Sequence, residues 1–175
     1  NSTNKQGPIS AKEVAKSLES FSEKIDSITE TIAKKADATA EISKLQERVE
    51  ILTKIAPLGI PLELMTEISA IDVYLGETSK AGKASQVFGE LRTRVELHSS
   101  SNIIAVACQG KDAAEVQMAM QELGAKSIQI PSGEGKPEVL LRDAQKEIAE
   151  YESTIQTCES KMAAWNNQNL SLIHI

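Results

Sequence analysis

The sequence predicts an α+β fold: a long antiparallel two-helix coiled-coil hairpin with an inserted ferredoxin-like (βαββαβ) lobe. Three observations predict it. Heptad seams of apolar residues occupy both ends of the chain. The segment between them alternates strand-like and helix-like patterns in ferredoxin-like order. The 175 residues are 41% hydrophobic but only 3% aromatic, which is typical of chains rich in long helices.

The first helix is predicted over residues 10–55, and residues 10–56 are assigned to a long coiled-coil helix. No Gly or Pro interrupts this stretch. The seam lapses at Lys35 and Thr39, which mark either a point where the hairpin bends or a stretch exposed to solvent. A helix this long, about 70 Å at 1.5 Å per residue, needs a partner helix. The seam residues are Val14, Leu18, Phe21, Ile25, Ile28 and Ile32, then, with a shifted phase, Ile42, Leu45, Val49 and Leu52.

The partner helix is predicted within residues 132–169, the returning coiled-coil helix. Pro137 suits the first turn of a helix. An antiparallel pair within one chain is favoured over parallel self-dimerisation of each seam, because both ends of the intervening segment must meet. The seam residues recur at strict steps of three and four: Leu141, Ala144, Ile148, Tyr151, Ile155, Cys158, Met162 and Trp165.

The middle of the chain, residues 57–131, is predicted to form the lobe. Pro57, Gly59 and Pro61 end the first helix. A short helix or turn over residues 62–68 precedes a half-buried strand over residues 71–75. The remaining strands are expected at residues 95–98, 103–108 and 128–130. The helices are expected at residues 84–94 and 113–123, the second capped by Asp112 and ended by Gly124.

Composition and charge exclude several function classes. The net charge of −6 argues against nucleic acid as the main partner, because phosphate binding needs an excess of Lys and Arg. No stretch approaches 18 consecutive apolar residues, so no membrane span is expected in this sequence. Two Cys cannot make a disulfide framework, and two distant His cannot make a usual zinc site.

Two glycine-containing loops are candidate phosphate-binding sites, and a few reactive side chains are candidate catalytic or metal-binding residues. Residues 76–84 lie between a strand and a helix, as a phosphate-binding loop does. They have five residues between the glycines, not four, and Ala84 stands where Ser or Thr is required, so an ordinary loop is predicted. The loop at residues 132–136 is expected to start the returning helix, with a phosphate nest as the alternative. Cys108 and Cys158 are interpreted as small buried hydrophobes, and His98 as a surface or satisfied histidine. No catalytic, cofactor-binding or metal residue is assigned.

Several segments resemble a known family, the cytoplasmic N-terminal part of subunit I, or subunit a, of archaeal-type and vacuolar-type rotary ATP synthases. The resemblance covers about residues 10–168, and the order and spacing of the segments carry it. Residues 70–77 (AIDVYLGE) resemble the first strand of that family's lobe, and residues 102–107 (NIIAVA) resemble its central strand. Residues 122–125 (ELGA) and 130–138 (IPSGEGKPE) resemble its exit into the return helix.

The resemblance implies a non-catalytic stator role, without a cofactor, at the cytoplasmic face of a membrane. The family's lobes dock peripheral stalk subunits, and its membrane half supplies proton or sodium transport coupled to ATP. That half and the strands of a proximal lobe are not in this sequence, so no ion-translocating residue is assigned. Tentative docking residues lie on the predicted helices 84–94 and 111–123 or the open sheet face: Glu90, Arg92, Arg94, Lys111 and Glu115.

Two other function classes remain open from the sequence. The lobe could be a regulatory module that binds a small ligand, since ferredoxin-like lobes often do. The chain could also be a coiled-coil adaptor arm of a chromosome-organising protein, although the basic patch expected for DNA binding is not visible.

The end of the sequence, residues 170–175, is predicted to be a non-native tail. It resembles a translated sequencing-adapter end, which would make the chain a fragment of a longer protein. The alternative is an ordinary apolar helix end. These residues, including His174, are left out of the fold prediction.

Overall fold

The computed structural model describes residues 10–66 and 68–173 and divides into two compact units. The first unit contains residues up to Ile42 together with those from Ala149 onward, and the second contains residues 43–148. Two long helices, α1 (Ala11–Ile55) and α5 (Pro137–Ile173), each contribute residues to both units. The predicted helix at residues 10–55 and the predicted helix start at Pro137 are therefore confirmed.

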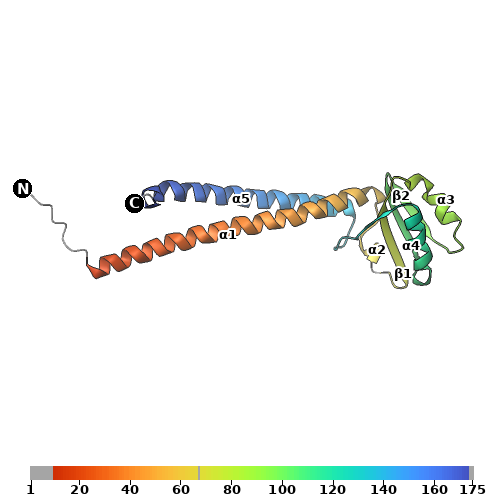
Figure 1. Ribbon diagram of the computed structural model, residues 1–175, viewed down its shortest axis with the longest axis horizontal. Coiled ribbons are helices and arrows are strands. Elements are labelled where there is room, and N and C mark those ends of the chain that lie inside the picture. The colour runs from red at the N-terminus through yellow and green to blue at the C-terminus, as the bar shows by residue number, and fades with distance from the viewer. Residues whose placement is uncertain (1–9, 67, 174–175) are drawn as a thin grey trace, which may run out of the picture. The chain divides into compact units, whose positions relative to one another are not determined.

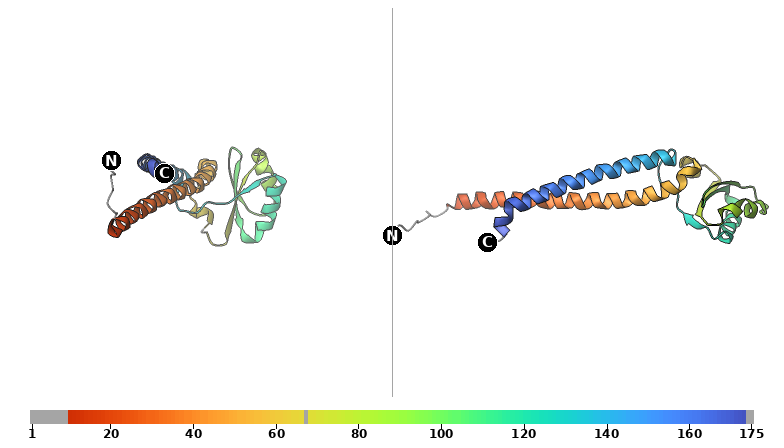
Figure 2. Two further views of the ribbon diagram at one scale, coloured as in Figure 1. Left: turned by 60° about the vertical axis from the view of Figure 1, so that its left-hand side comes forward. Right: turned by 90° about the horizontal axis from the view of Figure 1, so that it is seen from above.

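In the first unit, segments of α1 and α5 lie side by side with opposite chain directions (Figures 1 and 2). Lys35 of α1 and Glu159 of α5 form an ion pair at 3.4 Å. Ala38 and Cys158 are almost completely buried. The antiparallel helix pair predicted from the two seams is therefore confirmed.

The buried face of α5 is the seam that the sequence predicts. Every predicted seam residue of this helix, from Leu141 to Trp165, is buried or half-buried. The same spacing continues to Asn169, which is only 3% exposed and donates its side-chain amide to the backbone carbonyl of Trp165 at 2.8 Å. The helix extends to Ile173, whereas the predicted tail at residues 170–175 continues beyond the described residues, so its origin stays a prediction.

The buried face of α1 matches the predicted seam at Ile28 and from Ile42 to Leu52, but it differs from the rest of that seam. Five of its first six seam residues, Val14, Leu18, Phe21, Ile25 and Ile32, are 37–64% exposed. The buried and half-buried positions instead include one unbroken heptad repeat that starts at Ile28. It continues through Thr31, Lys35, Ala38, Ile42, Leu45, Val49 and Leu52. The predicted lapse at Lys35 is therefore wrong, because Lys35 lies on this face and is held by Glu159. Thr39 is exposed, and its hydroxyl donates to the carbonyl of Lys35.

The second unit contains a four-stranded antiparallel sheet with the strand order β2-β3-β1-β4. Its strands are β1 (Ile71–Glu77), β2 (Glu96–Ser100), β3 (Ile103–Gln109) and β4 (Lys126–Ile128). Two helices, α3 (Ala84–Gly89) and α4 (Ala113–Glu122), follow β1 and β3 in the chain. This order and pairing confirm the predicted ferredoxin-like lobe.

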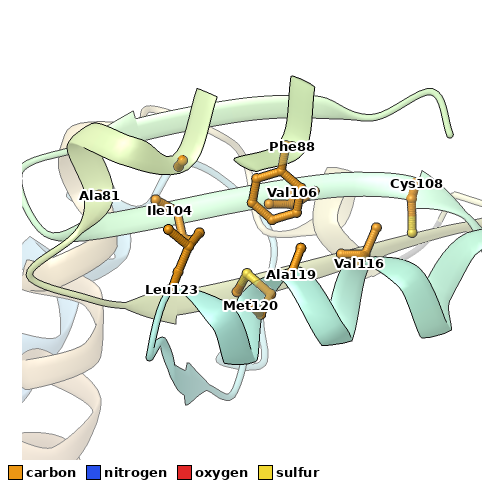
Figure 3. Close-up of a cluster of buried hydrophobic side chains, with 10 residues drawn as sticks. Ala81, Phe88, Ile104, Val106, Cys108, Val116, Ala119, Met120 and Leu123 are labelled. Carbon is orange, nitrogen blue, oxygen red and sulfur yellow. The ribbon is translucent and has the colours of Figure 1, made fainter. Parts of the chain in front are cut away.

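Helices α3 and α4 cover one face of the sheet (Figure 2). The core between them contains Phe88 of α3, Ile104 and Val106 of β3, and Val116 and Leu123 from the α4 side (Figure 3). Ile104, Val106 and Val116 are completely inaccessible to solvent. Burial of large aliphatic side chains contributes about 1.5–3 kcal/mol each, so this core stabilises the sheet.

The opposite face of the sheet packs against the end of α1 and the segment that follows it. Leu52 and Ile55 of α1 lie in one cluster with Leu62, Leu75 of β1 and Ile103 of β3. The short helix α2 (Glu63–Thr66) adds Met65 to this cluster. An ion pair at 2.9 Å between Lys54 and Glu77 joins α1 to β1, and this hydrogen bond raises the pKa of Lys54.

Some predicted boundaries are wrong for local reasons. The helix predicted over residues 84–94 ends at Gly89, because the chain then turns toward β2. Asp112 precedes α4 but makes no side-chain capping hydrogen bond, so the predicted cap is absent. Ile130 lies beyond the end of β4, although it packs against the Leu52 cluster. Gly124 ends α4 with a φ of +63°, as predicted.

The glycine-containing segment after β1 is not a phosphate loop. Gly76 lies inside β1 and pairs with Ile104 and Ser127. A Cβ atom there would lie 2.6 Å from the Met120 side chain and 3.0 Å from the Ala125 Cβ, so close packing explains the glycine. The buried Thr78 hydroxyl donates to the carbonyl of Leu123 at 2.6 Å, which fixes the loop to the end of α4.

The second glycine-rich loop, residues 132–136, binds groups of the chain itself. Gly135 has a φ of +107°, and its N–H donates to the Glu63 carboxylate at 2.8 Å. Its carbonyl accepts from the N–H of Leu62 at 3.0 Å. The guanidinium of Arg48 donates to the carbonyl of Ser132 at 2.6 Å. The loop therefore anchors α2 beside α1, and the phosphate nest is not needed to explain it.

We expect the contact between Glu63 and Gly135 to make stability depend on pH. The Gly135 N–H, with the N–H of Glu63 itself, lowers the pKa of Glu63 below its ordinary value. A carboxylate with a lowered pKa stabilises the fold above its unfolded-state pKa, and this contribution is lost as the pH falls through the lower folded-state pKa. Glu63→Gln should therefore lower the free energy of unfolding at pH 7, and the difference from the unmodified protein should shrink as the pH falls below the unfolded-state value. Urea unfolding at pH 7, 5 and 3 measures this, with the exposed Glu115→Gln as control; a difference independent of pH contradicts it.

Candidate docking surfaces

The five charged residues singled out from the sequence are exposed but do not share one surface. Glu90 caps the end of α3, and Arg92 and Arg94 lie in the segment that leads to β2. Lys111 and Glu115 lie at the start of α4, on the helical side of the sheet. No ion pair within the described part of the chain involves any of the five. They stay a predicted docking set.

An open groove of about 850 Å³ lies on the sheet face opposite α3 and α4. Its floor is formed by Ile71 and Val73 of β1 and by Ala105 and Ala107 of β3. One wall is formed by apolar residues of segment 58–65 together with Ile68, and the other contains Arg94, Val95, Glu96 and His98. Arg94 is therefore the one residue of the predicted docking set among those that line this groove.

A second hollow of about 560 Å³ lies on the helical side of the lobe. It is lined by Leu91, after α3, and by residues of α4 that include Glu115 and Met118. Met118 is 70% exposed, the largest exposed fraction among the large hydrophobic residues of the described chain. The hollow contains Glu115 from the predicted set, so the charged candidates divide between two faces of the lobe.

The reactive side chains have structural surroundings. Cys108 and Cys158 are free and buried, as predicted. Burial raises the pKa of the Cys108 thiol, and the nearby Asp72 and Asp112 carboxylates add to this, so the thiol stays protonated at neutral pH. His98 is exposed, with Nε2 3.0 Å from the Glu96 carboxylate.

The described residues form neither a metal-ligating cluster nor a membrane span. Over residues 10–66 and 68–173, no three His, Cys, Asp or Glu side chains cluster as a metal site would require. Within the same ranges, no helix is both long and apolar enough to cross a bilayer.

The apolar groove was missed by the sequence analysis. Leu64 and Ile68 were assigned to a short helix or turn, although they are 50% and 44% exposed at the groove wall. One signal for the groove is the pair Ala105 and Ala107, which places small side chains at the centre of a strand that otherwise contains Ile, Val and Cys. Such a pair leaves space above the sheet only when no larger side chain fills that space. The tertiary structure is needed to establish this.

The fold defines a class of protein in which a ferredoxin-like lobe is inserted between two long antiparallel helices. In sequence, 137 residues, or 73% of the chain, are 20% identical to the A-type ATP synthase subunit I of Thermococcus kodakarensis, of which the chain spans about a fifth. In structure, 97% of the chain matches 58% of the cytoplasmic N-terminal domain of subunit I, homolog of subunit a, of V-ATPase, with a TM-score of 0.54 and 14% identity. No protein-family model matches the chain. The predicted resemblance to subunit I is thereby confirmed.

Proposed function

We propose that this chain is a non-catalytic part of the stator of a rotary A/V-type ATPase. In this role it is a cytoplasmic arm that links the ion-translocating membrane part to the peripheral stalks. It would support proton or sodium transport coupled to ATP without taking part in the chemistry. The observation that carries the proposal is the similarity to subunit I over most of the chain, in both sequence and fold.

The physical properties of the chain support a mechanical role. In an antiparallel helix pair, each turn is held along a buried seam, so the pair resists bending better than a single helix does. Rotor torque must be opposed by a path of this kind, or the stator would turn with the rotor. The two hollows on the lobe are open and lined mainly by apolar and charged residues, as surfaces that dock another protein are.

Binding to purified peripheral stalk subunits tests the proposal. We expect charge reversal of all five docking candidates, Glu90, Arg92, Arg94, Lys111 and Glu115, to weaken pull-down of the stalk subunits by at least tenfold. All five are exposed and unpaired within the described chain, so the substitutions should leave the fold intact, which circular dichroism would check.

The matched control reverses two acidic and three basic residues on the exposed surfaces of α1 and α5: Glu19, Glu147, Lys16, Lys24 and Lys34. It changes the net charge by the same amount but lies outside the lobe, so stalk binding should be retained. Failure of the unmodified chain to bind any stalk subunit at micromolar concentration contradicts the proposed function. Equal binding by the five-residue variant contradicts the assigned docking residues.

A further inference from the structure

One end of the sheet face opposite α3 and α4 is only partly covered within the described structure. Leu52, Ile55 and Met65 cover the end of the sheet that carries Leu75 and Ile103. The groove occupies the other end, where strand register places Val73, Ala107 and Glu96 in one row across β1, β3 and β2. The opposite face is filled by α3 and α4 (Figures 2 and 3). The lobe therefore has one apolar surface that its own elements leave partly open.

The groove has the width of one α-helix. Three adjacent strands form its floor and far edge, and their spacing of about 4.8 Å gives a width of about 10 Å. An α-helix with its side chains is about 10–12 Å across. Ala107 is half-buried and contributes only a methyl group to the floor, which leaves depth for side chains from above, whereas Ala105 beside it is only 2% exposed. The groove is open along its side and does not enclose its contents, as a pocket for a small ligand would.

The walls of the groove carry exposed aliphatic side chains on one side and a cation on the other. Leu64 and Ile68 expose 50% and 44% of their surfaces at the first wall. At the second wall, the Glu96 carboxylate is held 3.0 Å from His98. Arg94 is exposed and has no ion-pair partner among the described residues. A binding partner therefore needs apolar side chains for the groove and a carboxylate at its edge for Arg94.

We propose that this groove binds an amphipathic helix of another protein, with acidic residues along one edge of its apolar stripe. Large apolar side chains at positions i, i+3 or i+4, and i+7 enter the groove between the wall at Leu64 and Ile68 and strand β2, and a carboxylate of the helix pairs with Arg94. Helix-in-groove recognition has this form. The inference goes beyond the proposed function, because it assigns the chemistry of the partner and the face it uses, whichever protein supplies the helix.

Two synthetic 18-residue helices test this inference with the full chain. Both carry the same Leu stripe, but one has Glu and the other has Lys along its edge. By fluorescence anisotropy, the Glu peptide should bind at least tenfold more tightly than the Lys peptide. Leu64→Glu should weaken binding of the Glu peptide at least tenfold, and Ile68→Glu should do the same as an independent variant. Arg94→Glu should reverse the preference between the two peptides.

The matched controls introduce the same changes outside the groove. Met118→Glu places a carboxylate on an even more exposed apolar residue at the other hollow, and Lys83→Glu reverses an exposed charge just before α3, on the helical side of the lobe. Both should bind the Glu peptide as the unmodified chain does. Equal affinity for both peptides overturns the inference, as does Glu-peptide binding that Met118→Glu abolishes and Leu64→Glu leaves unchanged.

Further outcomes distinguish a helix of another protein from other occupants of the groove. They also distinguish failure of the inference from failure of the proposed function. If a second copy covers the groove, analytical ultracentrifugation will show a dimer that Leu64→Glu dissociates, and the inference is overturned. Stalk subunits that bind the chain, together with a groove that does not discriminate the Glu peptide from the Lys peptide, support the proposed function and contradict the inference alone. A chain that binds the Glu peptide through the groove but binds no stalk subunit supports the inference and contradicts the proposed function.

Discussion

Replacing Leu52 by alanine should lower the free energy of unfolding of the second unit by about 2–5 kcal/mol. Leu52 is completely buried at the end of α1 and belongs to the same cluster as Leu75 of β1 and Ile103 of β3. Truncation removes apolar contacts and leaves a cavity between the helix and the sheet, and both terms destabilise. Amide hydrogen exchange in β1 and β3 measures the effect within this unit.

The matched control for Leu52 is Leu18→Ala on the same helix. Leu18 is 64% exposed, so its removal should change stability by less than about 0.5 kcal/mol. The comparison separates burial from helix propensity, because both substitutions put alanine into α1. Equal protection of β1 and β3 in the two variants would show that the end of α1 does not support the sheet.

Ile104→Asp should unfold the lobe at neutral pH. Ile104 is completely buried in the core between β3 and the helices α3 and α4 (Figure 3). A carboxylate there has no cation to pair with, and a buried unpaired charge costs several kcal/mol. Most single domains have only about 5–15 kcal/mol of stability in total. Near-ultraviolet circular dichroism and amide exchange in β3 would both report the loss.

The pH dependence of Ile104→Asp identifies the cause. A protonated carboxyl group costs less to bury than a carboxylate does, so part of the protection of β3 should return as the pH is lowered toward 4. Met118→Asp, at a residue that is 70% exposed, should be close to neutral at every pH. Unfolding of Ile104→Asp by the same extent at pH 4 and pH 7 would contradict the charge explanation.

The fold was largely predictable because its local signals agree with one another. The strand at Ile103–Gln109 is strongly apolar, and Gly124 and Pro137 mark the end of α4 and the start of α5. The seam of α5 repeats without interruption, so its buried face follows directly from the sequence. Patterns of this kind depend on neighbours within a few turns or one strand, which are visible without the tertiary structure.

The buried face of α1 was not predictable from the apolar residues alone. The most apolar line of the helix runs through Leu18, Ile25 and Ile32, yet these side chains are exposed. The face toward α5 contains Lys35, whose charge is matched by Glu159 across the pair. A sequence rule that rejects lysine from a seam cannot anticipate a partner glutamate far along the chain, so it predicts a lapse at Lys35 between the correctly predicted Ile28 and Ile42.

The candidate surfaces were only partly predictable. Exposure of the charged residues follows from their type, and all five are exposed. Their division between two faces depends on where α3 ends, since Glu90, Arg92 and Arg94 lie beyond Gly89 and not on a continued helix. The groove could not be predicted, because it depends on how far other elements cover Ala105 and Ala107, and no local sequence pattern contains that information.

The ion pair between Lys35 and Glu159 has a consequence for the order of folding. These residues lie more than a hundred positions apart, so closing the loop between them in an unfolded chain carries an entropy cost that grows with its length, by about 0.6 kcal/mol per doubling. Once the second unit has folded, Leu52 of α1 and Leu141 of α5 already share one cluster. The remaining loops from there to Lys35 and Glu159 are short. We therefore expect the lobe to fold first. The helix pair should then form progressively, starting at the ends of α1 and α5 that adjoin the lobe and adding one heptad at a time.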